Sequence, residues 1–209
     1  MVSGSPKIKV CGITVLEDAL AAIELGADAL GFVFHPDSPR NVSVEEAARI
    51  IRGLPPYVAT VGVFVNKPPD AVNDTADRCG LDLVQLHGDE SPEYCKHIRR
   101  RVVKAFRVRN RDSLRNLEDY AVSAVLLDAY VPGEYGGTGR PFNWDIAKET
   151  AKTETVVLSG GLTPQNIAAA VAAVRPYAVD VSSSVEISGD KRRKDTAKIK
   201  AFIKNAKRL

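Results

Sequence analysis

The sequence predicts a single-domain (β/α)8 barrel, and three observations support this prediction. Short apolar runs rich in β-branched residues alternate with amphipathic helical segments along the chain. These runs are apolar on both faces, which is typical of a parallel sheet that helices cover on both sides. Eight such units in 209 residues average about 26 residues each, enough for a strand, a helix and two short connections.

The expected strands follow one another at regular intervals and coincide with the apolar runs. They are Ile8–Cys11, Ala29–Phe34, Val58–Val65, Leu81–Leu86, Val102–Phe106, Ala124–Asp128, Thr155–Leu158 and Tyr177–Val181. We expect one domain over residues 1–209, with residues 1–6 extended or disordered. The rival architecture, a doubly wound open sheet, normally carries a glycine fingerprint after its first strand. Cys11-Gly12-Ile13-Thr14 stands there instead, and no GxGxxG or Walker loop occurs, so the barrel is favoured.

The helix boundaries are marked by capping residues. Leu16–Leu25 and Glu45–Leu54 carry apolar residues at helical spacing. The expected helix starts are the capping boxes Thr14-x-x-Glu17 and Ser43-x-x-Glu46 and the cap–proline pairs Ser91-Pro92 and Thr163-Pro164. The expected helix ends are Gly26, Gly53 and Gly80.

Composition argues against several classes of protein. Hydrophobic residues make up 44% and charged residues 26%, which is ordinary for a globular domain. No apolar run approaches the roughly 20 residues of a membrane span, and the N-terminus lacks a signal-peptide core. We therefore expect a cytoplasmic protein without a membrane partner.

The net charge of +3 hides an uneven distribution. Residues 190–209 contain nine Lys or Arg and two Asp, which leaves the rest of the chain mildly acidic. This segment also places Ile199, Phe202, Ile203 and Ala206 at helical spacing. An amphipathic terminal helix with a solvated basic face is therefore expected, and no nucleic-acid partner, since no aromatic residues are interleaved for base stacking.

Three cysteines, at an odd count and irregular spacing, form no disulfide framework and no zinc motif. Cys79 falls at a helix end and Cys95 inside the fourth helical segment, so structural roles are expected for both. Cys11 differs because it closes the first strand. A buried small hydrophobic residue and a functional thiol are both open interpretations of Cys11.

A barrel of this kind places its active site at the carboxyl ends of the strands. The residues found there are much more polar than the strands that precede them, as a substrate pocket requires. They are Cys11-Gly12, His35 to Arg40, Asn66, His87-Gly88, Arg107, Asp128, Ser159-Gly160-Gly161 and Ser182-Ser183-Ser184.

The loops after the seventh and eighth strands predict a phosphate site. Gly160 and Gly161 allow close backbone approach, and Ser182 and Ser183 follow the last strand. These two loops are the usual phosphate site of the fold. The alternative is a tight turn and a hydroxyl-rich cap that need no ligand.

Asp128 follows four apolar residues, and burial on one side favours its protonated form. It is a candidate general acid, unless it only caps a loop. Together with a thiolate at Cys11 across the ring, it would form an acid–base pair suited to isomerisation. Arg40 is a candidate partner for a substrate carboxylate, and His87 is either a base or a structural histidine. The glycine-dense segment Gly133–Gly139 is a candidate lid.

Taken together, these residues resemble phosphoribosylanthranilate isomerase, a family of tryptophan biosynthesis. The matching stretches span essentially the whole chain, in the family's order. They are Lys9-Val-Cys-Gly-Ile-Thr14, Gly31-Phe-Val-Phe34 with Ser38-Pro-Arg40, Val84-Gln-Leu-His-Gly88, Leu126-Leu-Asp128 with Gly136-Gly-Thr-Gly139, Ser159-Gly-Gly-Leu162 and Asp180-Val-Ser-Ser183.

The resemblance implies a cofactor-independent and metal-independent Amadori rearrangement of N-(5-phosphoribosyl)anthranilate to 1-(2-carboxyphenylamino)-1-deoxyribulose 5-phosphate. It implies that Asp128 is the general acid and Cys11 the general base. Arg40 would face the anthranilate, and the loops at Gly160, Gly161, Ser182 and Ser183 would hold the phosphate, with His87 also lining the substrate site. A monomer or a homodimer is compatible with this function.

Two features depart from the family pattern. Ser184 stands where the family usually has glycine, so its side chain could crowd the phosphate loop. The usual glycine-lysine-aspartate stretch is expanded to Gly189–Asp195, with a basic insertion at Lys191–Lys194. Two other hypotheses stay open from sequence: a related phosphate-binding barrel enzyme, such as indole-glycerol-phosphate synthase or a histidine-pathway sugar isomerase, and a non-catalytic phosphometabolite-binding barrel.

Overall fold

The strands close into a single parallel barrel. A computed structural model describes residues 4–129 and 143–207. Each strand pairs in parallel with its sequence neighbours, and β8 pairs with β1 through the register Lys7↔Ala178 to Val10↔Val181. The strands are β1 (Lys7–Cys11), β2 (Ala29–Val33), β3 (Ala59–Phe64), β4 (Leu83–Leu86), β5 (Arg101–Val108), β6 (Ala124–Ala129), β7 (Val156–Leu158) and β8 (Ala178–Val181). The predicted (β/α)8 barrel, the TIM-barrel fold, is confirmed.

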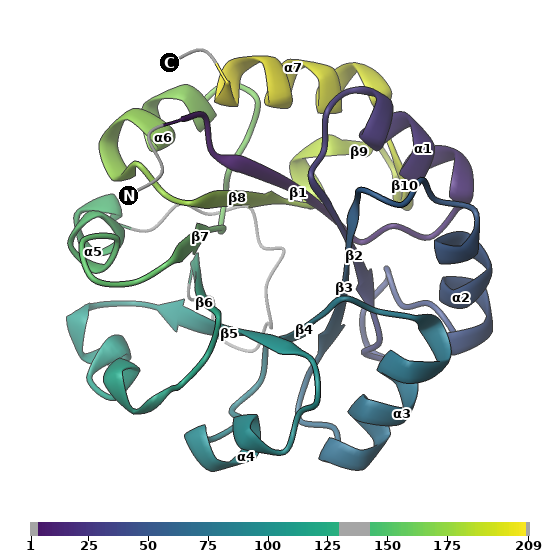
Figure 1. Ribbon diagram of the computed structural model, residues 1–209. Coiled ribbons are helices and arrows are strands. Elements are labelled where there is room, and N and C mark those ends of the chain that lie inside the picture. The colour runs from purple at the N-terminus through teal and green to yellow at the C-terminus, as the bar shows by residue number, and fades with distance from the viewer. Residues whose placement is uncertain (1–3, 130–142, 208–209) are drawn as a thin grey trace.

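Helices surround the barrel as an outer ring (Figure 1). They are α1 (Leu16–Glu24), α2 (Val44–Arg52), α3 (Pro69–Cys79), α4 (Pro92–Lys96), α5 (Trp144–Thr150), α6 (Ile167–Val174) and α7 (Thr196–Ala206). The connection from β5 to β6 holds two short 3-10 helices, η1 (Arg111–Leu114) and η2 (Leu117–Asp119), and a third, η3 (Ser183–Val185), follows β8. Between β5 and β6 these short turns therefore stand where the other units have an α-helix.

The capping predictions have mixed outcomes. Ser43 and Glu46 form the predicted capping box at α2, and the Ser91 side chain accepts a hydrogen bond from the Tyr94 amide at α4. The box predicted at Thr14 is wrong, because the Thr14 hydroxyl donates to the Arg192 carbonyl and Val15 precedes α1 without a side-chain cap. The Thr14 side chain is therefore used in a tertiary contact and does not cap α1.

The helix predicted at Pro164 begins later, at Ile167. The Thr163 hydroxyl accepts hydrogen bonds from the amides of Gln165 and Asn166, both at 3.2 Å, and so forms a turn ahead of the helix. Local side-chain bonds of this kind compete with helix formation. Among the predicted end glycines, Gly26 and Gly80 adopt the left-handed backbone, whereas Gly53 stays right-handed.

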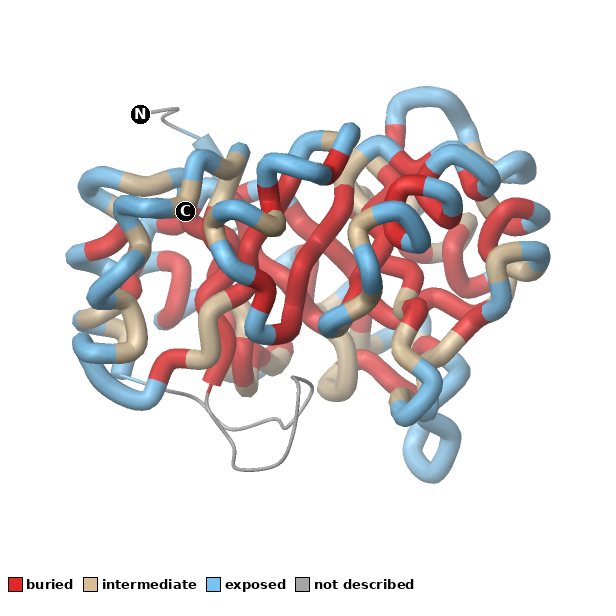
Figure 2. The backbone as a smooth tube through the Cα atoms, turned by 90° about the horizontal axis from the view of Figure 1, so that it is seen from below, coloured by how far each residue is buried: buried red, intermediate tan, exposed pale blue. Residues whose placement is uncertain are grey.

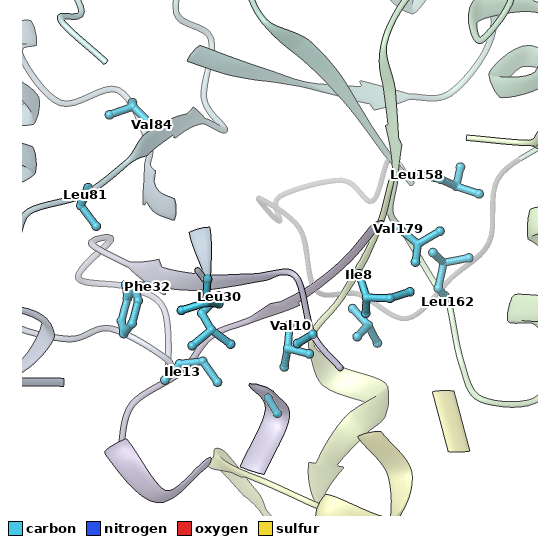
Figure 3. Packing of buried hydrophobic residues seen from close by; sticks show 14 of the residues in the cluster. Ile8, Val10, Ile13, Leu30, Phe32, Leu81, Val84, Leu158, Leu162 and Val179 are labelled. Atoms are coloured by element: carbon cyan, nitrogen blue, oxygen red, sulfur yellow. The ribbon is translucent and has the colours of Figure 1, made fainter. Parts of the chain in front are cut away.

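The hydrophobic core has two parts, separated by the wall of strands. The larger part lies between the barrel and the helices, and Figure 3 shows Ile8, Val10 and Val179 among its members. The smaller part contains Val103, Ala105, Leu126, Val157 and Ala178. Because side chains alternate along a strand, this second set lies inside the barrel. Figure 2 shows the buried segments running through the centre of the molecule, with exposed segments around them.

The smaller core sets the position of the functional residues. Asp128 follows Leu126 by two residues, and Asp180 follows Ala178 by two residues, so each projects into the barrel interior one step nearer the carboxyl end. On β1 the register partner of Asp180 is Lys9, and Cys11 lies one inward-facing step further toward the carboxyl end. The apolar layer therefore supports a polar layer at the barrel mouth.

The basic C-terminal segment divides into a hairpin and a helix. β9 (Glu186–Ile187) pairs antiparallel with β10 (Asp190–Lys194), and α7 buries Ile199, Phe202, Ile203 and Ala206. The predicted amphipathic helix is confirmed. Within residues 4–129 and 143–207, no helix is long and apolar enough to cross a membrane.

Candidate active site

A cavity of about 590 Å³ opens at the carboxyl ends of the strands. It brings together the residues predicted to be catalytic or to bind substrate: Cys11, Arg40, His87, Asp128, Gly160, Gly161, Ser182 and Ser183. His35, Gln85, Asp180, Glu186 and Lys191 also line it. Asn66 and Arg107 were predicted from strand ends but do not line it; they interact with Asp89 instead.

Asp128 lies deep in this cavity and is 1% exposed. One carboxylate oxygen, Oδ1, accepts the Ala129 amide at 2.8 Å, and the other, Oδ2, lies 3.2 Å from His87 Nε2. Although these two atoms are close, Nε2 makes no hydrogen bond within the described chain. Asp128 also lines the cavity, where a ligand can reach it.

The orientation of His87 depends on β4. Gln85 Nε2 lies 2.8 Å from His87 Nδ1, and both side chains are buried. With the amide nitrogen as donor, Nδ1 accepts, and the neutral ring carries its proton on Nε2, facing Asp128. His87 therefore lies beside the carboxyl group of Asp128, as a structural partner or a ligand donor.

The loop after β7 passes very close to Asp128. A Cβ placed on Gly160 would lie 2.8 Å from Asp128 Oδ1 and would overlap the Ala129 amide. Gly160 and Gly161 both have positive φ, at +79° and +67°. Only glycine combines this backbone conformation with such close approach. The amides of Gly160, Gly161 and Ser183 donate no hydrogen bond within the described chain, so they are available to an anion.

Cys11 is 8% exposed and ends β1 at the cavity wall. Burial raises the pKa of the Cys11 thiol above its usual value, and the nearby Lys9 ammonium offsets part of that rise. The neutral thiol therefore predominates near neutral pH. Cys79 and Cys95 are buried as well, away from the cavity, as expected of structural residues.

Arg40 lies at the cavity in an ion-paired arrangement. Its guanidinium binds Glu186 with two hydrogen bonds, Nε–Oε1 at 2.6 Å and Nη2–Oε2 at 3.1 Å. Lys194 Nζ also binds Glu186 Oε1, at 3.1 Å, and donates to the Ser182 carbonyl. Two cations thus share one carboxylate, which leaves an excess positive charge beside the loop after β8.

The two departures from the family pattern have clear places in the structure. The Ser184 hydroxyl donates to the Leu162 carbonyl at 2.6 Å, joining the loops after β7 and β8, and Ser184 does not line the cavity. In the basic insertion, Lys194 is buried, whereas Arg193 pairs with Asp18 on α1. Asp195 caps α7 by accepting two amides.

The candidate lid Gly133–Gly139 lies outside the described residues. Within the described part of the chain, no group of three or more His, Cys, Asp or Glu side chains is arranged to hold a metal ion.

The sequence model of the N-(5'-phosphoribosyl)anthranilate (PRA) isomerase family matches residues 8–205. The chain belongs to this family. A relative named N-(5'-phosphoribosyl)anthranilate isomerase, from Geobacter sulfurreducens, is 60% identical over 201 residues, covering 96% of this chain and 98% of the relative. The predicted resemblance is confirmed, and with it an isomerase of tryptophan biosynthesis.

Solved structures of the isomerase family agree with this assignment. Phosphoribosyl anthranilate isomerase from Thermotoga maritima has a TM-score of 0.89 and 45% identity, covering 98% of this chain and all of that chain. Another structure, of the isomerase in complex with reduced 1-(o-carboxyphenylamino)-1-deoxyribulose 5-phosphate, has a TM-score of 0.86 and 44% identity over the same coverage.

Three charged residues in or next to the site were not singled out from the sequence. Glu186 carried no signal, because its partner Arg40 is 146 positions away. Lys9 and Asp180 were noted only as parts of matching stretches, because each lies inside an expected strand. The partners of these charged side chains can be identified only in the folded barrel.

Proposed function

We propose that this chain converts N-(5'-phosphoribosyl)anthranilate to 1-(2-carboxyphenylamino)-1-deoxyribulose 5-phosphate, with Asp128 as general acid and Cys11 as general base. The observation that carries the proposal is that one cavity is lined by both groups, on β6 and β1, and by two glycine and serine loops. Family membership supports the choice of substrate.

Asp128 starts the reaction by donating a proton to the furanose ring oxygen. The bond between C1′ and that oxygen breaks, and the anthranilate nitrogen lone pair forms a protonated Schiff base with C1′. Burial at 1% exposure and a position at the wall of the substrate cavity suit this role. His87 Nε2 lies 3.2 Å from this carboxyl group and bounds its position on one side.

Cys11 then removes the proton from C2′. The C–H electron pair forms the C1′–C2′ double bond, and the Schiff-base nitrogen becomes the neutral amine of an enolamine. Tautomerisation moves a proton to C1′ and leaves a ketone at C2′. Because burial raises the pKa of Cys11, the thiolate that accepts this proton becomes more abundant as the pH rises.

Positive charge and backbone amides hold the two ends of the substrate. The free amides of Gly160, Gly161 and Ser183 bind the phosphate, with Ser182 completing the loop. Arg40 binds the anthranilate carboxylate with the guanidinium N–H groups that Glu186 does not use. A phosphorylated small molecule is then the ligand, and the active assembly is a monomer or a homodimer.

Turnover of freshly generated phosphoribosylanthranilate by wild type and by Cys11→Ser tests this proposal. We expect the variant to lose about 10²–10⁴-fold in kcat with little change in KM, because a serine hydroxyl is a much weaker base than a thiolate. Cys79→Ser, which changes a buried thiol away from the cavity, is the matched control and should retain its rate. Near-wild-type turnover by Cys11→Ser would show that Cys11 is not the general base.

A further inference from the structure

A buried ion pair lies directly beneath Cys11 in the barrel interior. Lys9 Nζ donates to Asp180 Oδ1 at 2.8 Å, and both side chains are 7% exposed. The two residues are register partners on β1 and β8. A buried ion pair is weak evidence for stability, because desolvating two charges offsets most of their attraction. A pair placed between an apolar layer and a substrate cavity therefore suggests another purpose.

The end of the Lys9 side chain meets the thiol. A Cβ placed on Gly31 of β2 would lie 2.6 Å from Cys11 Sγ and 3.1 Å from Lys9 Cε. Both side chains therefore converge on the bare α-carbon of Gly31. Any larger residue at position 31 would push one of them away. Asp180 lines the substrate cavity together with Cys11, whereas Lys9 does not.

The other cations near Cys11 come from outside β1 and β8: they are Lys194, and Arg40, whose side chain packs against the adjacent Gly12. Lys194 on β10 acts on the thiol, but its own charge is shared with Glu186, which also binds Arg40. Next to Cys11 on β2 stands Gly31, which carries no charge. The ion pair is thus the nearest charged neighbour of the thiol on its own strand and on β8.

The two members of the pair act on Cys11 in opposite directions. After burial, which raises the pKa of the thiol, the next largest influences are Lys9, which lowers that pKa, and Asp180, which raises it. Burial alone would lower the pKa of Lys9, but Asp180 and Cys11 outweigh it and raise the pKa to about 12. Lys9 therefore stays charged throughout the range in which an enzyme works.

We infer that Lys9 and Asp180 are positioning residues that set the balance between thiol and thiolate at Cys11, an inference that rests on the proposed role of Cys11 as base. Lys9 stabilises the thiolate that removes the C2′ proton. Asp180 anchors the ammonium and limits its effect, so that the thiolate does not become too weak a base. The pair acts through Cys11 and need not touch the substrate.

The test is the pH dependence of Cys11 alkylation by iodoacetamide, measured on the Cys11 peptide by mass spectrometry. Lys9→Met removes the positive charge, and we expect the inflection of alkylation rate against pH to move about one to three pH units higher. Asp180→Asn keeps an oxygen that accepts from Lys9 but removes the negative charge, so its inflection should move lower. The pH profile of kcat/KM should move in the same two directions.

Opposite shifts distinguish this role from a structural one. If the pair were purely structural, both variants would have a lower melting temperature and the inflection at Cys11 would not move. That result would overturn the inference. Shifts of the Cys11 inflection in the same direction in both variants would also overturn it. The Cys79 and Cys95 peptides serve as internal controls. If Lys9→Met does not fold, two other variants still test the inference. In Lys9→Arg, which keeps the charge, Cys11 should titrate as in the wild type. In Asp180→Asn, Cys11 should titrate at lower pH.

Alkylation is independent of turnover, so failure of this inference can be told from failure of the proposed function. If Cys11→Ser keeps its full rate, the base assignment fails, even when the Lys9 and Asp180 variants shift the thiol. If Cys11→Ser is inactive and neither variant shifts the thiol, the reaction assignment survives and the inference fails.

Discussion

Replacing Asp128 by Asn changes the chemistry of the site while preserving its shape. The side chain is 1% exposed, and Oδ1 accepts the Ala129 amide at 2.8 Å. An asparagine oxygen can keep that hydrogen bond. Its NH₂ group then occupies the place of the second oxygen, 3.2 Å from His87 Nε2. We expect the fold to tolerate this change, with a loss of stability of about 1–2 kcal/mol from the altered contact with His87.

The effect on catalysis should be much larger. A carboxamide does not donate a proton to the furanose oxygen as a carboxylic acid does, so ring opening loses its general acid. Such a loss is about 10²–10⁴-fold in kcat, which corresponds to about 3–5 kcal/mol of barrier height. KM should change little, because the phosphate loops and Arg40 are untouched.

The assay is the initial rate of loss of substrate fluorescence, with the ketose product identified by NMR. Asp28→Asn is the matched control, since Asp28 accepts from the Ile8 amide at 2.9 Å and pairs with Lys7 at the opposite end of the barrel. Its rate should stay at the wild-type value. A kcat for Asp128→Asn within about threefold of wild type, in a folded protein, would refute the general-acid role.

Three further predictions concern binding, stability and pH. Arg40→Met should raise KM about 10–100-fold with little change in kcat, because it removes a charged hydrogen bond to the substrate; an unchanged KM in steady-state titration contradicts this role. Lys104→Met should lower the free energy of unfolding, measured by urea titration, by about 3–5 kcal/mol. The reason is that the buried Glu90 carboxylate, 3.0 Å from Lys104 Nζ, would lose its cation. A loss below about 1 kcal/mol would count against that pairing. For the wild type, kcat/KM should rise with pH in the alkaline range, because the raised pKa of Cys11 delays formation of the thiolate; a profile already flat at neutral pH would speak against this base.

Much of the fold could be predicted because a parallel barrel repeats the same strand-and-helix pattern along the sequence. Each strand is buried on both faces, so its apolar run stands out between polar helix starts. The capping box at Ser43 was readable for the same reason, since its contacts are local. The box at Thr14 was not, because its hydroxyl is used by the Arg192 carbonyl, which the fold brings in from far along the chain.

The candidate site could be predicted to the extent that strand order determines it. Cys11 and Asp128 were recognisable because each ends a strand, and strand ends meet at one rim of the barrel. The paired charges could not be predicted. That Arg40 meets Glu186, or Lys9 meets Asp180, follows from barrel closure and side-chain direction, neither of which sequence spacing records.

Turnover of freshly generated phosphoribosylanthranilate by the purified wild-type chain tests the central claim most directly. Substrate fluorescence is followed with time, and the product is identified by NMR. We expect the fluorescence to fall at a rate proportional to enzyme concentration while the deoxyribulose 5-phosphate ketose accumulates, without added metal or cofactor. Protein that is folded by circular dichroism, yet gives no ketose above the uncatalysed rate, would contradict the claim.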